Sequence, residues 1–227
     1  PRRAICPGLT HSVRIAHDGC IQMKITVRGR ACHQALVDPA TEPMRLAIDL
    51  ARAIVVAGDG LRETRSDIPG IANSTLNVTR ICGGEYFGMA PGRVEIWVDR
   101  RVLPSENFDA AEDHLQRLVG DFRNRNHADI ECEVVQRAAP LRPSPEQTPW
   151  AQLVQREART VLGVDVPLGG VPLYTDARWF GAHGIPTVMY GAGAEDLVEA
   201  GVNGEDENVA EKDVCSATQV VARVIAA

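Results

Sequence analysis

The chain has 227 residues, of which 44% are hydrophobic, and its net charge is −6. This length suits one large domain or two small ones, and the hydrophobic share is enough to build a core, which argues against a disordered chain. The acidic balance and the absence of a long basic run argue against nucleic-acid or anionic-membrane binding, and no apolar run reaches the length of a membrane span.

Residues 1–6 do not begin a signal peptide, because no long apolar segment follows the two arginines. There is also no initiator methionine, so we expect a piece of a longer protein. The six cysteines are scattered and form no CxxC pair, which argues against a zinc ribbon. Four of them lie within strand or helix patterns as small apolar residues, which favours a reducing cytoplasm.

Residues 20–28 predict a strand, because apolar and polar side chains alternate along them. The strand ends at Gly29 and leads to His33, a side chain whose charge changes near neutral pH. A strand followed by a glycine can hold this imidazole rigidly while the ring stays exposed. A histidine that is simply satisfied at the surface or in the core is the competing interpretation.

The next elements follow in clear succession. They are a helix from Pro43 to Val55, a loop at 58–72, strands at 74–82 and 91–104, a helix at 106–124 and a short strand at 130–134. The order β-α-β-β-α-β across 20–136 is that of a ferredoxin-like unit, a four-stranded antiparallel sheet with two helices on one face. Its exposed edge and uncovered face favour pairing with a second copy.

Four prolines within residues 138–149 mark a boundary. Beyond it the sequence predicts a helix at 149–162, a glycine-rich turn at Gly169-Gly170, a helix at 175–183, a buried strand at 186–190 and a helix at 211–226. Two helix–strand alternations do not complete an α/β domain. We therefore expect more sheet from sequence before residue 1, with the ferredoxin-like unit as an insertion.

Other enzyme signatures are missing. No GxSxG elbow, GxGxxG or P-loop occurs. Gly191-Ala192-Gly193 follows a predicted strand, but it lacks the third glycine and the βα unit of a nucleotide site.

Seven stretches, in their order and spacing, resemble the C-terminal two-thirds of the M20-type metallopeptidases and deacylases. This family includes acetylornithine deacetylase, succinyl-diaminopimelate desuccinylase, aminoacylases and glutamate carboxypeptidases. The matching stretches are residues 16–19, 29–33, 77–84, 99–104, 174–178, 184–187 and 206–209.

The resemblance implies an α/β fold with an α+β lid: a ferredoxin-like βαββαβ dimerisation domain inserted in a zinc-peptidase-type catalytic domain that is incomplete here. Residues 1–18 would end the N-terminal catalytic segment, 19–137 would form the lid, and 138–227 would form the C-terminal part of the catalytic domain. The implied partners are a second copy, bound through the lid, and a small-molecule substrate. Nucleic acid and membranes are not expected partners.

The implied reaction is hydrolysis of an amide bond in an N-acyl amino acid or small peptide, by a water that two zinc ions activate. His33 would reach into the partner's site and stabilise the oxyanion. Arg101 would grip a substrate carboxylate. Further substrate contacts would come from Asn77, Thr175, Asp176 and Arg178.

Two of these residues also have a structural interpretation. Without the resemblance, Arg101 reads as an exposed sheet arginine paired with Asp99 or Glu95. Asp176 reads as the N-cap of a helix.

The family's metal ligands are largely missing. Residues 5–10, where a carboxylate is expected before the lid, contain no acid, and Asn203 stands where the C-terminal histidine is expected. Asparagine is a poor zinc ligand. His11 and His17 are isolated candidates, and the acidic run 205–207 reads as a solvated loop. No metal ligand is therefore assigned in this chain.

Three hypotheses follow. The first is a fragment or degenerate copy of an M20-type hydrolase with little or no activity alone. The second is a non-catalytic dimerising or small-molecule-binding module that keeps the lid fold. The third is an active enzyme whose remaining ligands come from a separate chain.

Overall fold

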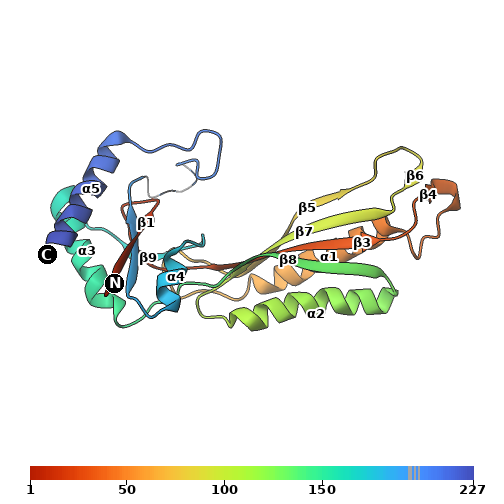
Figure 1. The fold of residues 1–227 in the computed structure, drawn as a ribbon, viewed down its shortest axis with the longest axis horizontal. Helices are drawn as coiled ribbons and strands as arrows, with labels where there is room; N and C mark the ends of the chain where they lie inside the picture. The colour runs from red at the N-terminus through yellow and green to blue at the C-terminus, as the bar shows by residue number, and fades with distance from the viewer. Residues whose placement is uncertain (194–195, 197, 199) are drawn as a thin grey trace. The chain divides into compact units, whose positions relative to one another are not determined.

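The structure, a computed structural model, describes residues 1–193, 196, 198 and 200–227. These residues form two compact units, each with its own four-stranded sheet (Figure 1). The first unit contains Pro1–Asp18, Asp67–Ala72 and Pro140–Ala227, and the second contains Gly19–Ser66 and Asn73–Ala139. Among the described residues, no helix combines the length and apolarity that a membrane crossing requires.

The second unit has the predicted ferredoxin-like topology. Its antiparallel sheet has the strand order β5-β7-β3-β8. In chain order the elements are β3 (Gly19–Arg28), α1 (Pro43–Leu61), β5 (Thr75–Gly83), β7 (Arg93–Val102), α2 (Phe108–Asn126) and β8 (Asp129–Ala138). The two helices run along this sheet in Figure 1. The βαββαβ prediction is confirmed.

Strand alternation decides which face of this sheet is covered. Along β7, Val94, Ile96 and Val98 are buried, whereas the alternating Glu95 and Asp99 are only half-buried. The buried side chains of β3 and β7 form one core with the apolar faces of α1 and α2. A polar face is thus left on the opposite side of the sheet, as the period of two requires.

Helix α1 begins at Pro43 as predicted. It ends at Leu61, so it continues past residue 58, where the loop was expected to start. The loop was predicted because residues 58–72 are polar and contain several glycines and prolines. The structure gives Gly58 another role, because a Cβ there would lie 2.2 Å from the carbonyl oxygen of Leu76. The glycine lets the helix pack closely on β5.

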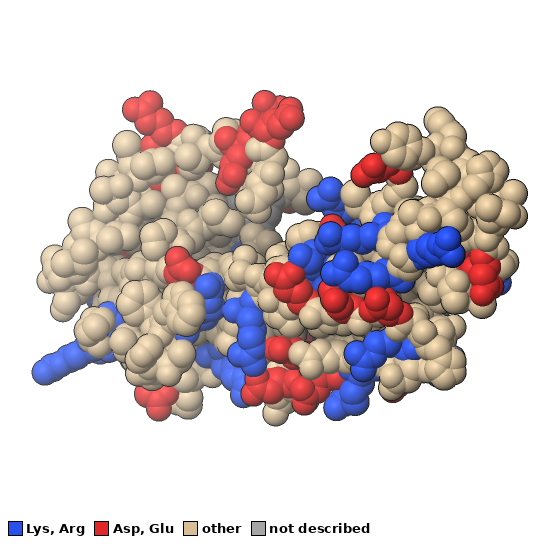
Figure 2. All heavy atoms as spheres, turned by 45° about the vertical axis from the view of Figure 1, so that its right-hand side comes forward, with Lys and Arg blue, Asp and Glu red and all other residues tan. Residues whose placement is uncertain are grey.

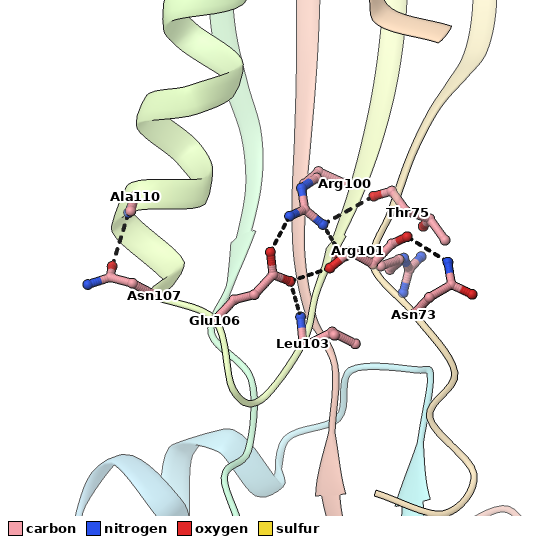
Figure 3. Close-up of polar contacts among 9 residues, drawn as sticks. Asn73, Thr75, Arg100, Arg101, Leu103, Glu106, Asn107 and Ala110 are labelled. Carbon is pink, nitrogen blue, oxygen red and sulfur yellow. Dashed lines mark hydrogen bonds and ion pairs between the residues drawn. The ribbon is translucent and has the colours of Figure 1, made fainter. Parts of the chain in front are cut away.

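A buried polar network fixes one end of this sheet (Figure 3). The Arg100 side chain is only 2% exposed and donates to Glu106 Oε1 at 2.5 Å. Glu106 Oε2 accepts from the backbone N–H of Leu103 at 2.7 Å and from Ser74 Oγ at 2.5 Å. One carboxylate therefore joins the end of β7, the approach to β5 and the turn before α2, where Asn107 caps the helix.

The first unit contains a sheet with the order β1-β10-β2-β9. Its strands are β1 (Ala4–Gly8), β2 (Val13–His17), β9 (Leu168–Val171) and β10 (Thr187–Gly191). Helices α3 (Gln147–Leu162) and α5 (Glu211–Ala226) share a core with Val188 and Tyr190, whereas α4 (Ala177–Ala182) packs with Met189 on the other face. The predicted helices and the strand at 186–190 are confirmed.

Two features of this unit differ from the sequence analysis. Gly169 and Gly170 lie in strand β9, not in a turn, and β1 and β2 were not predicted as strands. A Cβ at Gly169 would lie 2.4 Å from the carbonyl oxygen of Pro69, so close backbone contact explains this glycine. Similarly, a Cβ at Gly191 would clash with the Gly8 carbonyl. Close backbone packing therefore explains the first glycine of Gly191-Ala192-Gly193, and no nucleotide site is needed.

The buried pair gives the first prediction. Glu106→Ala leaves the Arg100 guanidinium buried without its carboxylate, so the free energy of unfolding should fall by about 3–5 kcal/mol in urea titration. Glu131→Ala is the control, because it breaks an exposed ion pair with Arg28 and should leave stability nearly unchanged. Equal losses in the two variants would contradict a special role for the buried pair.

Candidate functional site

His33 lies in a small two-stranded sheet, here called the β4–β6 ladder, at one end of the second unit (Figure 1). Strand β4 (Cys32–His33) pairs with β6 (Met89–Ala90), and His33 faces Met89 in this register. The imidazole is exposed, and its Nδ1 accepts from the backbone N–H of Ala35 at 3.2 Å. The neutral ring therefore carries its proton on Nε2, which leaves that atom as a donor.

Arg101 is held by Asp99 on the polar face of the sheet. Its Nε lies 2.7 Å from Asp99 Oδ1, and its Nη2 lies 3.1 Å from Oδ2. Asp99 also accepts from Gln22 Nε2 at 2.9 Å. The pairing with Asp99 is the structural alternative that the sequence left open, and it orients the guanidinium by a two-point contact.

Asn77 belongs to the same polar face. It is exposed on β5 directly opposite Asp99 in the β5–β7 register. Burial, with the nearby Asp99 carboxylate second, raises the pKa of the Cys20 thiol to about 12, so this cysteine stays protonated. The sequence argument missed Gln22 and Cys20, although strand alternation assigns both of them to this face.

The β3–β7 ladder separates His33 from the group around Arg101. Arg101 pairs with Cys20 near one end of the ladder, and Arg93 pairs with Arg28 at the other. Eight residues of strand correspond to about 27 Å. His33 lies in the β4–β6 ladder, beyond the Arg28–Arg93 end of the β3–β7 pair (Figure 1). One small substrate molecule cannot contact both residues of a single copy.

In the first unit, Thr175, Asp176 and Arg178 surround the start of α4. The Thr175 hydroxyl accepts from the backbone N–H of Ala177 at 3.2 Å and donates to Met189 Sδ at 3.3 Å. Asp176 occupies the N-cap position, but its side chain makes no capping bond and is 79% exposed. The capping role suggested for Asp176 thus belongs to Thr175.

Arg178 is held in place by carbonyl and aromatic contacts. Its guanidinium donates to the Thr175 carbonyl at 3.0 Å and lies 5.4 Å from the Tyr174 ring centroid and 4.7 Å from that of Trp179. Stacking and hydrogen bonding together keep the side chain largely buried.

His17 is a buried neighbour of this loop. Its ring is fully buried, and Nδ1–H donates to the Asp18 carbonyl at 2.8 Å. Burial, with the Arg178 charge as a smaller cause, lowers the pKa of His17 from 6.5 to about 4. The ring is therefore neutral at physiological pH, and its Nε2 has no hydrogen-bond partner among the described residues.

A cavity of about 470 Å³ opens where the parallel strands β1 and β10 end. Such carboxyl ends are common ligand sites in α/β sheets. Glu207 and Asn208 are its polar lining residues, and Gly8, Leu9 and Gly193 are among the others.

The donor set near this cavity does not fit a zinc site. Asn203 has a left-handed backbone with φ of 62°, and its N–H donates to Glu207 Oε2 at 3.1 Å. Glu205 and Asp206 are exposed. Within the described ranges no three His, Cys, Asp or Glu side chains are grouped so that they could hold a metal.

Comparison with known proteins shows what the chain is similar to. The family model of the M20 peptidase dimerisation domain matches residues 15–126. A putative succinyl-diaminopimelate desuccinylase of Mycobacterium tuberculosis is 24% identical over 218 residues, which cover 91% of this chain and 53% of that protein. Residues 15–126 thus form an M20 peptidase dimerisation domain, and the chain as a whole resembles the M20-type metallopeptidases and deacylases.

Solved structures of M20-type enzymes share the fold. Human carnosine dipeptidase 1 superposes with a TM-score of 0.73 at 16% identity, covering 97% of this chain and 57% of that one. Aminopeptidase PepT from Bacillus cereus gives a TM-score of 0.66 at 18% identity, covering 98% and 55%. The chain thus spans about half the length of the relatives it matches. His33, Asn77 and Arg101 lie inside the matched domain, and their roles remain predictions.

The burial of His17 predicts a pH effect on stability. The unfolded chain binds a proton at His17 below pH 6.5 but the folded chain does so only near pH 4, so stability falls as pH drops between these values. The loss attributable to His17 is up to about 3 kcal/mol.

Urea unfolding at several pH values tests this. His17→Gln should be less stable at pH 7 but should lose less stability on acidification than the wild type. His114→Gln, on an exposed position of α2, should keep the wild-type pH dependence. Parallel curves for the wild type and His17→Gln would rule out His17 as the source.

Proposed function

We propose that this chain supplies the lid, the dimer contacts and part of the substrate site of a metal-dependent hydrolase that cleaves an amide bond in an N-acyl amino acid or small peptide. In this proposal residues 19–137 act as the lid, and residues 1–18 and 138–227 belong to the catalytic domain. The observation that carries the proposal is the exposed imidazole of His33, whose Nδ1 is occupied by the Ala35 N–H. Its Nε2–H is a suitable donor to the oxyanion that forms when water attacks an amide.

His33 acts in the site of a partner copy. The length of the β3–β7 ladder supports this, because His33 lies beyond the end opposite Arg101. In the dimer, Arg101 of one subunit, oriented by Asp99, binds the substrate carboxylate. The His33 that serves the same substrate comes from the other subunit. Asn77, Thr175, Asp176 and Arg178 complete the proposed substrate contacts.

Two zinc ions per complete active site are part of the proposal, since they would activate the water. The described residues of this chain do not supply a fitting set of ligands. We therefore assign to this chain the holding of substrate and the donation of a hydrogen bond, and no step at the metal. A cytoplasmic location is also proposed, and the six free cysteines are consistent with it.

The dimer contact is proposed at the β5 edge of the second unit. Ile48, Val55 and Val56 form an exposed apolar stripe on α1, being 55%, 48% and 64% exposed, and Ile81 adds to it from β5. The β8 edge exposes only Val135 among large hydrophobic residues of that strand. Apolar surface beside an open edge strand favours self-pairing.

The alternative is a non-catalytic dimerising or small-molecule-binding module with the same fold. The observation that favours it is Asn203 at the position where the resemblance expects a metal-binding histidine. Hydrolysis assays distinguish the two, because a binding module retains ligand affinity without turnover.

His33→Ala gives the direct test. In the natural polypeptide that carries these residues, it should lower kcat for amide hydrolysis by about 100-fold or more, because an oxyanion donor is lost. Its thermal unfolding should match the wild type, since the ring is exposed. An unchanged rate would remove His33 from the mechanism.

Mixed dimers test donation to the partner. His33→Ala and Arg178→Ala protomers should each be inactive alone, but a mixed dimer regains one intact site if His33 acts across the interface. If each subunit uses its own His33, mixing restores nothing.

Val56→Glu tests the dimer surface. A charge in the apolar stripe should weaken self-association at least tenfold in sedimentation equilibrium, because the carboxylate would have to be desolvated. Val135→Glu on β8 is the matched control and should leave the dimer intact. Dissociation by Val135→Glu alone would move the interface to the opposite edge.

A further inference from the structure

The β4–β6 ladder and the segments next to it expose a group of large apolar side chains around His33. Phe87 is fully exposed, Leu36 and Tyr86 are 79% and 73% exposed, and Met89 is 42% exposed. We call these four residues the apolar collar. Scattered apolar residues are normal on a surface, but a cluster of this kind marks a contact site.

The backbone presents the collar beside the imidazole. Gly84 and Gly88 have positive φ angles of 85° and 76°, and they bracket the turn that contains Tyr86 and Phe87. The Gln34 N–H donates to the Gly88 carbonyl at 2.7 Å, and His33 pairs with Met89. Phe87 directly precedes Gly88, which is hydrogen-bonded to Gln34, the residue after His33. Phe87 therefore lies close to His33.

The two segments that meet at His33 contain no charged side chain, although Arg30, Asp38 and Glu85 lie just outside them. Residues 31–37 and 86–91, the two segments that face each other here, contain no Asp, Glu, Lys or Arg. In Figure 2 the end of the second unit that bears the β4–β6 ladder is largely tan, the colour of residues other than these four types, with some red and blue groups among them. The exposed apolar side chains beside His33 therefore favour an apolar group over a carboxylate.

We infer that the apolar collar contacts the substrate beside the bond that His33 serves, and that it selects an uncharged, apolar acyl group. This rests on the proposed function, because it takes His33 to reach a substrate. The selected class differs from the succinyl group in the name of the mycobacterial relative, since succinyl ends in a carboxylate.

Hydrolysis of two matched substrate sets tests the inference. N-hexanoyl and N-succinyl derivatives of the same mixture of amino acids are offered to the natural polypeptide that carries these residues. The wild type should have the higher kcat/KM for the hexanoyl set, by about 10-fold or more. Phe87→Lys should lower this ratio at least tenfold, because an ammonium replaces apolar contact and attracts the succinyl carboxylate. Phe87→Leu should keep most of the preference.

Val135→Lys is the control, since it adds the same charge on strand β8, away from the β4–β6 ladder. It should leave the hexanoyl-to-succinyl ratio of kcat/KM unchanged. Three outcomes would overturn the inference while the proposed function stands: a wild-type preference for succinyl, an equal ratio in Phe87→Lys and the wild type, or an equal shift in Val135→Lys. Absence of hydrolysis with every substrate would overturn the proposed function, and the inference with it.

Discussion

The ten-residue pairing of β3 with β7 is the constraint on which the arrangement of the candidate site depends. It fixes the covered face, because the alternation that buries Val94 and Ile96 turns Asp99 and Arg101 outward. It also fixes the distance between Arg101 and His33, because the length of the strands separates Arg101 from the β4–β6 ladder. A single copy therefore presents two groups of polar side chains that a small substrate cannot bridge, and the proposed dimer would resolve this separation.

Most of the second unit was predictable because its periodicity is strong and long. Ten-residue strands and nineteen-residue helices repeat their patterns several times, so chance matches are few. Two errors, one in each unit, occur at glycines. The sequence predicted a loop at Gly58 and a turn at Gly169, yet each lies inside a regular element where another backbone comes within 2.5 Å of the missing Cβ. Local sequence signals an unusual residue but does not say whether a turn or a close contact requires it.

The site was less predictable, because alternation gives a face but not a partner. It assigned Arg101 to the polar face and left two carboxylates as candidates, and only the structure selects Asp99. Asp176 was expected to cap α4, but the neighbouring Thr175 hydroxyl makes that bond. The β4–β6 ladder that carries His33 escaped prediction altogether, since strands of two residues are too short to show any period and the two strands lie far apart in the sequence.

Asn203 illustrates how backbone geometry competes with metal chemistry at one position. Its φ of 62° lies in the left-handed region, which asparagine tolerates well, and its N–H is satisfied by Glu207. The Glu207 carboxylate that accepts this bond is thereby directed to the loop's own backbone. A role in shaping the loop thus explains both residues without a metal. In the proposed function, donors outside the described set would activate the water, and the role proposed for this chain is to present the imidazole and the apolar surface beside it.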